Sequence, residues 1–381
     1  MTPMERVLAA FSPEGAQAFP VVLCYESILI RDHWSELTQA PWWDLFSPEI
    51  ERQLAWRNDV IKALGQDWFS LPPIPPREER EAWAIEIRSK DPLLVHRLTG
   101  EVRRLRRPAI SGWEETGKSH SNHSLGPLPE TPDDIDARFP VPKPFDPLLF
   151  RQSGQADLAD ALLREHPGLF PIASVPSPLW SVQGLLGFEH FMILLAENPD
   201  LVGRAADRAL QAILETVQHH ATLGARGIWI EECMTDMISP VLFQTLNLPR
   251  LQRLTDAIRT MGLVSIYYFC GPVSNRLDLL LSAGADALAF EEDKKGFCND
   301  IVEIADTVRG RCVLLGNLDA MILLEKGSEA ELRAELHRQA KAGRRNRSRF
   351  LFSLGSPVTP GTAVSRVRLF TDLAHEIGSC S

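Results

Sequence analysis

The sequence contains no apolar run of the roughly 20 residues that a membrane-spanning helix needs. No apolar segment follows the first charged residues either, so we expect a cytoplasmic protein without a secretory signal or a membrane partner. A disulfide-rich framework is also excluded, because the six cysteines in 381 residues show no paired spacing. Their thiols are therefore expected to be reduced and available for packing or for chemistry.

Excess positive charge is absent as well, since 40 lysines and arginines stand against 50 aspartates and glutamates, giving a net charge of −10. Nucleic-acid binding depends on clustered basic side chains that neutralise phosphates. The one basic run, residues 341–349, ends a helical pattern, where cations favour the helix C-terminus. The sequence therefore predicts no nucleic-acid partner.

A glycine-rich phosphate-binding fingerprint does not follow the first apolar run, which argues against a doubly wound dinucleotide-binding sheet. Eight short apolar runs instead alternate with helical patterns along the chain. The runs are residues 19–23, 68–71, 170–174, 227–230, 264–269, 287–290, 312–315 and 350–353. This alternation predicts an α/β fold, a (β/α)8 TIM barrel, formed as a single domain by residues 1–381.

The alternation is interrupted after the second run by an insertion over residues 72–150. Residues 84–88 and 95–105, which contain a Thr99-Gly100 turn, are predicted to form a β-hairpin. A polar loop, residues 111–132, follows and is typical of a lid over a binding pocket. Its His120 and His123 have a spacing that suits a metal, but in so polar a loop we interpret them as surface residues.

Barrel enzymes carry their chemistry at the C-terminal ends of the strands, so the candidate site residues follow the apolar runs. Cys270 ends the fifth run, between Glu231 and Glu232 after the fourth and Glu291 and Glu292 after the sixth. Crowded carboxylates raise one another's pKa unless a cation lies among them. Zn²⁺ held by a thiolate and carboxylate oxygens satisfies this condition, and pairing with Arg or Lys is the alternative. For the cysteine alone, packing as a small hydrophobic residue is also open.

Four stretches resemble the uroporphyrinogen decarboxylase superfamily in order and spacing. They are ISPVLFQTLNLPRLQRLTDAI (238–258), GADALAFEED (284–293), LLGNLDAMILLEKG (314–327) and FSLGSPVTPGT (352–362). That superfamily contains cofactor-free porphyrinogen decarboxylases and zinc methyltransferases that exchange methyl groups with a corrinoid protein. CYESILIRDHWSELTQAPWW (24–43), followed by DWFSLPP (67–73), looks like the corrinoid-dependent branch that takes methyl groups from methoxylated aromatics.

The resemblance also implies a ligand set for the metal. In the methyltransferases a His-x-Cys motif lies on strand five and a second Cys follows strand eight, and the matching residues here are Tyr268, Cys270 and Ser356. One ligand is kept and two are replaced. We therefore predict Cys270, Glu232 and Glu292 as the zinc ligands, with Glu231 and Glu291 as the alternatives on the same strands.

The decarboxylase branch fits the sequence less well. Its arginine-rich motif after strand one grips the carboxylates of the macrocycle, whereas this chain has only Arg31 in that region. A rim dominated by Glu and Asp also opposes a substrate with many carboxylates.

The resemblance therefore implies a methyltransferase that moves a methyl group from a small donor, a methoxylated aromatic, to the Co(I) corrinoid of a partner protein. Carboxylate ligands donate less charge than thiolates, so the zinc ion would act as a Lewis acid on the ether oxygen. The predicted catalytic residues are Tyr25, Glu26 and Tyr268, and the predicted substrate-binding residues are Trp180, Phe269, Asn317 and Ser356.

Two other classes of function remain open at this point. One is a metal-free decarboxylase or lyase of the same superfamily, in which Glu and Tyr residues transfer protons. The other is a binding protein whose barrel has lost its chemistry. A homodimer is compatible with either class and with the methyltransferase.

Overall fold

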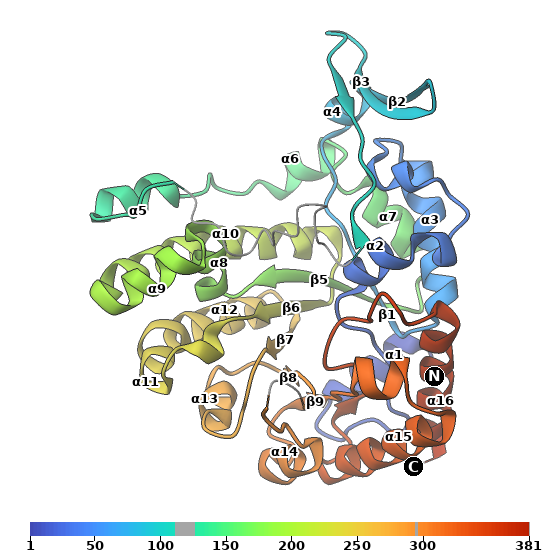
Figure 1. The fold of residues 1–381 in the computed structure, drawn as a ribbon, viewed down its shortest axis with the longest axis vertical. Helices are drawn as coiled ribbons and strands as arrows, with labels where there is room; N and C mark the ends of the chain where they lie inside the picture. Colours follow the sequence, from blue (N-terminus) through green and yellow to red (C-terminus); the bar gives the residue numbers. More distant parts are fainter. Residues whose placement is uncertain (111–125, 294–295, 381) are drawn as a thin grey trace.

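The computed structural model describes residues 1–110, 126–293 and 296–380. In this part of the chain a parallel sheet of seven strands curls in the order β1-β5-β6-β7-β8-β9-β10, with helices around it (Figure 1). The strands are β1 (Trp68–Ser70), β5 (Phe170–Pro176), β6 (Gly227–Glu232), β7 (Val264–Phe269), β8 (Ala287–Phe290), β9 (Val313–Leu315) and β10 (Phe350–Leu351). The fold is the TIM-barrel-like α/β arrangement that the alternation predicted.

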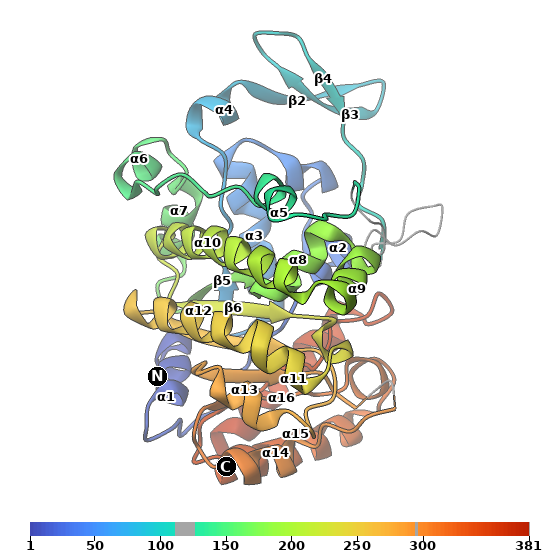
Figure 2. The same cartoon turned by 90° about the vertical axis from the view of Figure 1, so that its left-hand side faces the viewer.

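Helices connect the strands and cover the outer face of the sheet (Figures 1 and 2). Those before β5 are α1 (Pro3–Phe11), α2 (Glu26–Leu37), η1 (Trp42–Phe46), α3 (Ile50–Leu64), α4 (Arg77–Glu81), α5 (Pro132–Arg138), α6 (Pro147–Gln152) and α7 (Asp157–Glu165). Those after it are α8 (Pro178–Leu186), α9 (Phe188–Glu197), α10 (Pro199–Leu223), η4 (Thr235–Met237), α11 (Pro240–Leu242), η5 (Phe243–Asn247), α12 (Leu248–Thr260), α13 (Leu277–Ser282), α14 (Ile301–Val308), η6 (Ala320–Glu325), α15 (Glu329–Arg345) and α16 (Val364–Cys380).

The strands at the centre of the sheet are buried on both faces. In β7 the side chains of Ile266, Tyr267, Tyr268 and Phe269 are all 1% exposed or less. This burial explains why the strand reads as a continuous apolar run rather than an alternating one. Among the described helices no single one is long and apolar enough to cross a membrane, and α8 and α9, which meet those criteria only as a pair, are bent by 114°.

The first predicted strand, residues 19–23, is not a regular strand, which corrects the sequence prediction. It makes an isolated parallel bridge between Val21 and Phe352, next to β10. On the side of β1, the N–H groups of Val21 and Leu23 donate to the side chains of Asp67 and Gln66 at 2.7 and 2.8 Å. Pro20 has no N–H to give to a ladder. The segment therefore lies between the two edge strands of the curled sheet and bonds partly through side chains.

The insertion after β1 contains a three-stranded antiparallel sheet, where a two-stranded hairpin was predicted. Its strands are β2 (Trp83–Arg88), β3 (Asp91–His96) and β4 (Val102–Arg104), in the order β2-β3-β4. Residues 95–105 fold back on themselves at the predicted turn, where Gly100 has a φ of 71° that favours glycine. The sheet projects from one end of the molecule (Figures 1 and 2). Most of the predicted lid, with His120 and His123, lies outside the described residues.

Asp67 joins the N-terminal segment to the sheet. Its carboxylate is 1% exposed and accepts from Arg6 at 2.5 Å and from the Val21 N–H at 2.7 Å. His375 of α16 lies 3.0 Å from the same carboxylate. Three segments that are distant in sequence therefore depend on one buried anion.

Replacing Asp67 with Ala should lower the free energy of unfolding by about 3 kcal/mol, because a buried N–H and a cation lose their partner. Chemical denaturation of the variant and the parent measures the difference. Asp372→Ala is the control, since the Arg368–Asp372 pair is exposed on α16 and should change stability by less than about 0.5 kcal/mol. Equal effects of the two substitutions would contradict the role assigned to Asp67.

Candidate active site at the carboxyl end of the barrel

Two thiols meet at the C-terminal ends of β6 and β7. Cys270 directly follows β7, and its N–H donates to the carbonyl of Glu232 at 3.0 Å, so the ladder continues one residue beyond the strand. Cys233 directly follows β6. The two sulfur atoms are 2.9 Å apart, within hydrogen-bonding contact. A pair of adjacent strand ends therefore presents two soft, polarisable groups at one point of the rim.

A phenol and a carboxyl group adjoin the thiols. The hydroxyl of Tyr25 lies 3.9 Å from Cys233 Sγ and 4.0 Å from Cys270 Sγ, and the Cys233 thiol donates to Glu231 Oε1 at 3.7 Å. Burial is the main reason that the pKa values of Glu231 and Tyr25 are raised. The pKa of Cys233 is raised by its hydrogen bond to Cys270 and by burial. Each of these three shifts is in the direction of the uncharged form of its group.

Aromatic rings form the inner wall of the barrel beside this cluster. The Tyr25 and Tyr268 rings meet edge to face with centroids 5.4 Å apart, and Trp229 stacks on Tyr268 at 5.2 Å. Trp68 from β1 meets Trp229 edge to face at 6.1 Å. Such a wall suits a flat or apolar substrate whose polar atom faces the thiols.

The two glutamates at the end of β6 point to opposite faces. Glu231 pairs in register with Tyr268 and faces the thiols. Glu232 is fully buried on the other face, where it accepts from Asn247 at 2.5 Å and from Tyr267 at 3.1 Å, and burial raises its pKa to about 7. The prediction of Glu232 beside Cys270 therefore chose the wrong member of the pair, because successive strand residues alternate between faces.

The glutamates after β8 are held near the end of β10. Ser356 Oγ donates to Glu292 Oε2 at 2.6 Å, so these two predicted site residues do come together. Tyr268 donates to the carbonyl of Gly355 at 2.7 Å. A Cβ at Gly355 would lie 2.3 Å from the Glu292 nitrogen, so only glycine permits this close approach.

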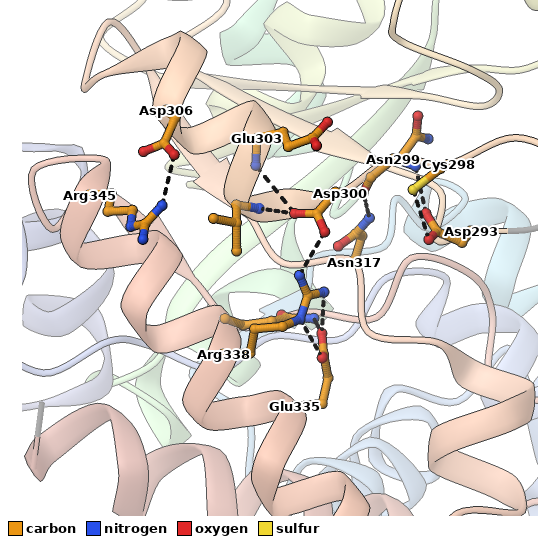
Figure 3. A network of polar contacts seen from close by, with 12 residues as sticks. Asp293, Cys298, Asn299, Asp300, Glu303, Asp306, Asn317, Glu335, Arg338 and Arg345 are labelled. Atoms are coloured by element: carbon orange, nitrogen blue, oxygen red, sulfur yellow. Dashed lines mark hydrogen bonds and ion pairs between the residues drawn. The ribbon is translucent and has the colours of Figure 1, made fainter.

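Three other predicted residues lie away from the thiols. Phe269 is fully buried and meets Phe243 edge to face at 6.2 Å, so it does not line the barrel mouth. Asn317 donates to the backbone carbonyls of Asn299 at 2.8 Å and Glu291 at 3.2 Å, and so supports the loop after β8 (Figure 3). Glu26 accepts from Gln66 at 2.6 Å and lines a separate cavity. A fourth, Trp180, is half-buried on α8.

The predicted zinc ligands do not fit a metal ion as they are placed. Glu232 faces away from Cys270, and Glu292 is engaged by Ser356. Among the described residues, no group of three or more His, Cys, Asp or Glu side chains could hold a metal ion. Cys233 and Cys270 supply two donors of the type that zinc accepts, and Glu231, whose Oε1 is 3.7 Å from Cys233 Sγ, does not complete with them a group that could hold the ion.

Cys233 and Trp229 are the site residues that the sequence prediction did not assign. Both lie within or just after an apolar run that was recognised. The signal for Trp229 was its two-residue spacing from Glu231, which places both on one face of the strand. The signal for Cys233 was weaker, because it lies beyond the regular strand, where alternation no longer predicts direction.

The backbone at the site departs from common geometry. Tyr25, the residue before α2, has a φ of 56° and ψ of 40°, and Met234, the residue after Cys233, has a φ of 65°. Left-handed conformations are unfavourable for residues with a side chain and often occur at functional sites. Here they follow directly on the strand ends that present the phenol and the thiol.

Comparisons with known proteins are consistent with this architecture. The family model described as uroporphyrinogen decarboxylase (URO-D) matches residues 128–377. The uroporphyrinogen decarboxylase of Anaeromyxobacter dehalogenans (strain 2CP-C) is 25% identical over 272 residues, which are 69% of this chain and 74% of that protein. Uroporphyrinogen decarboxylase 2, chloroplastic, of Arabidopsis thaliana is 23% identical over 192 residues, covering 50% of this chain and 46% of that protein.

A solved structure described as a methyltransferase from Methanosarcina mazei superposes with a TM-score of 0.67 and 17% sequence identity, and the match covers 99% of both chains. At that identity the likeness concerns the fold. The family model, in contrast, spans more than half of the sequence and includes every strand from β5 to β10. The chain therefore belongs to the uroporphyrinogen decarboxylase family.

Proposed function

We propose that the protein is a methyltransferase that takes a methyl group from a small methoxylated aromatic donor and passes it to the corrinoid of a partner protein. The observation that carries the proposal is the Cys233–Cys270 thiol pair, which lies beside Tyr25 at the mouth of an aromatic-walled barrel. The fold likeness to a protein described as a methyltransferase is compatible with it.

Two arginines near the strand ends, Arg31 and Arg276, are not placed to bind a substrate with many carboxylates. Arg31 is held by both oxygens of Asp32, at 2.7 and 3.0 Å. Arg276 donates to backbone carbonyls that follow β6, including that of Thr235 at 3.1 Å. Both cations are thus engaged within the protein. A donor with a single polar atom and an aromatic ring fits the stacked rings of Trp229 and Tyr268 better.

In this proposal the chain binds the donor ring, excludes water and supplies a proton. The bond between the methyl carbon and oxygen breaks, both electrons stay on oxygen, and the methyl group leaves as a cation equivalent. The corrinoid of the partner supplies Co(I), which provides the electron pair for the new bond. Glu231, whose burial raises its pKa, holds the proton that the leaving phenolate oxygen accepts. Zinc bound through the two thiols remains a proposal, and none of these steps depends on it.

A metal-free decarboxylase or lyase is the second candidate. It is favoured by the burial of Glu231, which raises the pKa of that carboxyl group in the direction that proton transfer requires. Two assays of the purified protein separate the candidates. Loss of the Co(I) absorbance of cob(I)alamin in the presence of a methoxylated aromatic supports the methyltransferase, whereas release of CO₂ from a carboxylated aromatic without that loss supports the lyase. Zinc analysis of the parent, Cys233→Ser and Cys270→Ser tests the thiol-bound metal separately.

Replacing either Cys233 or Cys270 with Ser should remove most methyl transfer from methoxylated aromatics to cob(I)alamin, followed by the loss of the Co(I) absorbance. The reason is that Cys233 donates to Glu231, the proposed proton donor, and that Cys270 contacts Cys233 and Tyr25. Cys298→Ser is the matched control, because that thiol is exposed and donates to Asp293. Full activity in both site variants, with folding confirmed by circular dichroism, would overturn the assignment.

Glu231→Gln should lower kcat/KM about 100-fold, as expected for loss of a proton donor. Glu232→Gln should keep most activity, because Glu232 lies on the outer face and a Gln oxygen still accepts from Asn247 and Tyr267. The two substitutions are chemically identical and adjacent, so each controls for the other. A larger loss of kcat/KM in Glu232→Gln than in Glu231→Gln would mean that the side chain on the outer face of β6, and not the one beside the thiols, takes part in the reaction.

A further inference from the structure

A cavity lies between α2, α3 and the end of β1, apart from the thiol pair. Its volume is about 220 Å³, and most of its lining is apolar, including Ile30, Leu45, Val60, Ile61 and Phe69. The charged side chains that line it are Glu26 and Arg31 from α2 and Arg57 from α3. A small hydrophobic cavity with a few converging polar groups is the usual form of a small-molecule site.

Arg57 provides a mostly buried cation at this cavity. Its guanidinium lies over the Trp56 ring, 3.9 Å from the centroid, and burial lowers its pKa to about 10. Within the described part of the chain Arg57 donates through Nη1, to the backbone and side-chain oxygens of Gln53. A cation in such surroundings is stabilised by an anion that reaches its remaining N–H groups.

Glu26 faces the same cavity but is a poor partner for Arg57. Its Oε2 accepts from Gln66 Nε2 at 2.6 Å, and the other end of that amide accepts from the Leu23 N–H at 2.8 Å, which fixes the amide orientation. Burial raises the pKa of Glu26 to about 7, against the opposing effects of Gln66 and Arg57. Near neutral pH a large fraction of Glu26 is therefore an uncharged acid, able to donate a hydrogen bond.

Arg31 is the third charged group that lines the cavity. Its guanidinium is already neutralised, because Asp32 accepts two hydrogen bonds from it. Arg57 and Leu45 also line a neighbouring groove of about 300 Å³, whose other side includes Trp83 and Leu94 of the three-stranded sheet. The two hollows thus adjoin at Arg57, which gives a ligand an approach from the insertion side.

We propose that this cavity binds a small organic monocarboxylate with an apolar body, the ligand carboxylate pairing with Arg57 and accepting a hydrogen bond from Glu26. The apolar body occupies the space between Ile30, Val60 and Phe69. This site is separate from the thiol pair, and the inference does not depend on methyl transfer.

Calorimetric titration of the full-length protein with benzoate at pH 6 tests the inference. The parent should bind benzoate, and Arg57→Gln should weaken binding at least about 10-fold, because the carboxylate loses its cation. Arg344→Gln is the matched control, since Arg344 also lies over a ring, that of Phe19 at 4.0 Å, but lines neither the cavity nor the groove beside it. Benzamide, which is neutral and similar in shape, should bind much more weakly than benzoate.

The pH dependence separates this site from adventitious binding. As the pH rises through about 7, Glu26 ionises, stops donating and repels the ligand carboxylate, so the affinity for benzoate should fall. Glu26→Gln stays neutral and should bind benzoate with an affinity that changes little between pH 6 and 8. No benzoate binding by the parent at pH 6, equal binding by Arg57→Gln, or equal competition by inorganic phosphate would overturn the proposal.

Discussion

The buried carboxylate of Asp67 is the contact on which the candidate site depends most. The curled sheet has two edges, β1 and β10, and residues 19–23 lie between them. Asp67 binds this segment on the β1 side while Phe352 binds it on the other. Because Tyr25 is only two residues beyond the segment, its hydroxyl reaches the two thiols only if the segment is held in place. Distant residues on α1 and α16 take part through the same carboxylate.

The chemistry of the site follows from which face each residue takes. A one-residue step along β6 separates Glu231, which touches a thiol, from Glu232, which is enclosed by Asn247 and Tyr267. Both carboxyl groups are desolvated, and both have raised pKa values, yet only one can meet a substrate. A perturbed carboxyl group therefore marks a functional site only when its position in the fold is also known.

Much of the fold could be predicted from the sequence because buried parallel strands are continuous apolar runs, and residues 227–230, 264–269 and 287–290 lie within observed strands. Burial on both faces also explains why the sequence did not predict the direction of the side chains. An apolar run without alternation does not reveal which face of the sheet a residue takes. Glu232 was misassigned for that reason. The positions of Cys233 and of residues 19–23 are set by hydrogen bonds to side chains that are distant in sequence. A local sequence pattern does not predict such hydrogen bonds.

Tyr25 keeps its phenol at the thiols while its backbone occupies a region that glycine or asparagine adopts more readily. Selection for thermal tolerance alone would therefore favour glycine or asparagine at this position, since either relieves the backbone, whereas other small residues keep the strain. Natural variants or engineered libraries chosen only for heat resistance should drift away from tyrosine here, and those chosen for turnover should retain it. Thermal stability and catalysis therefore favour different residues at position 25.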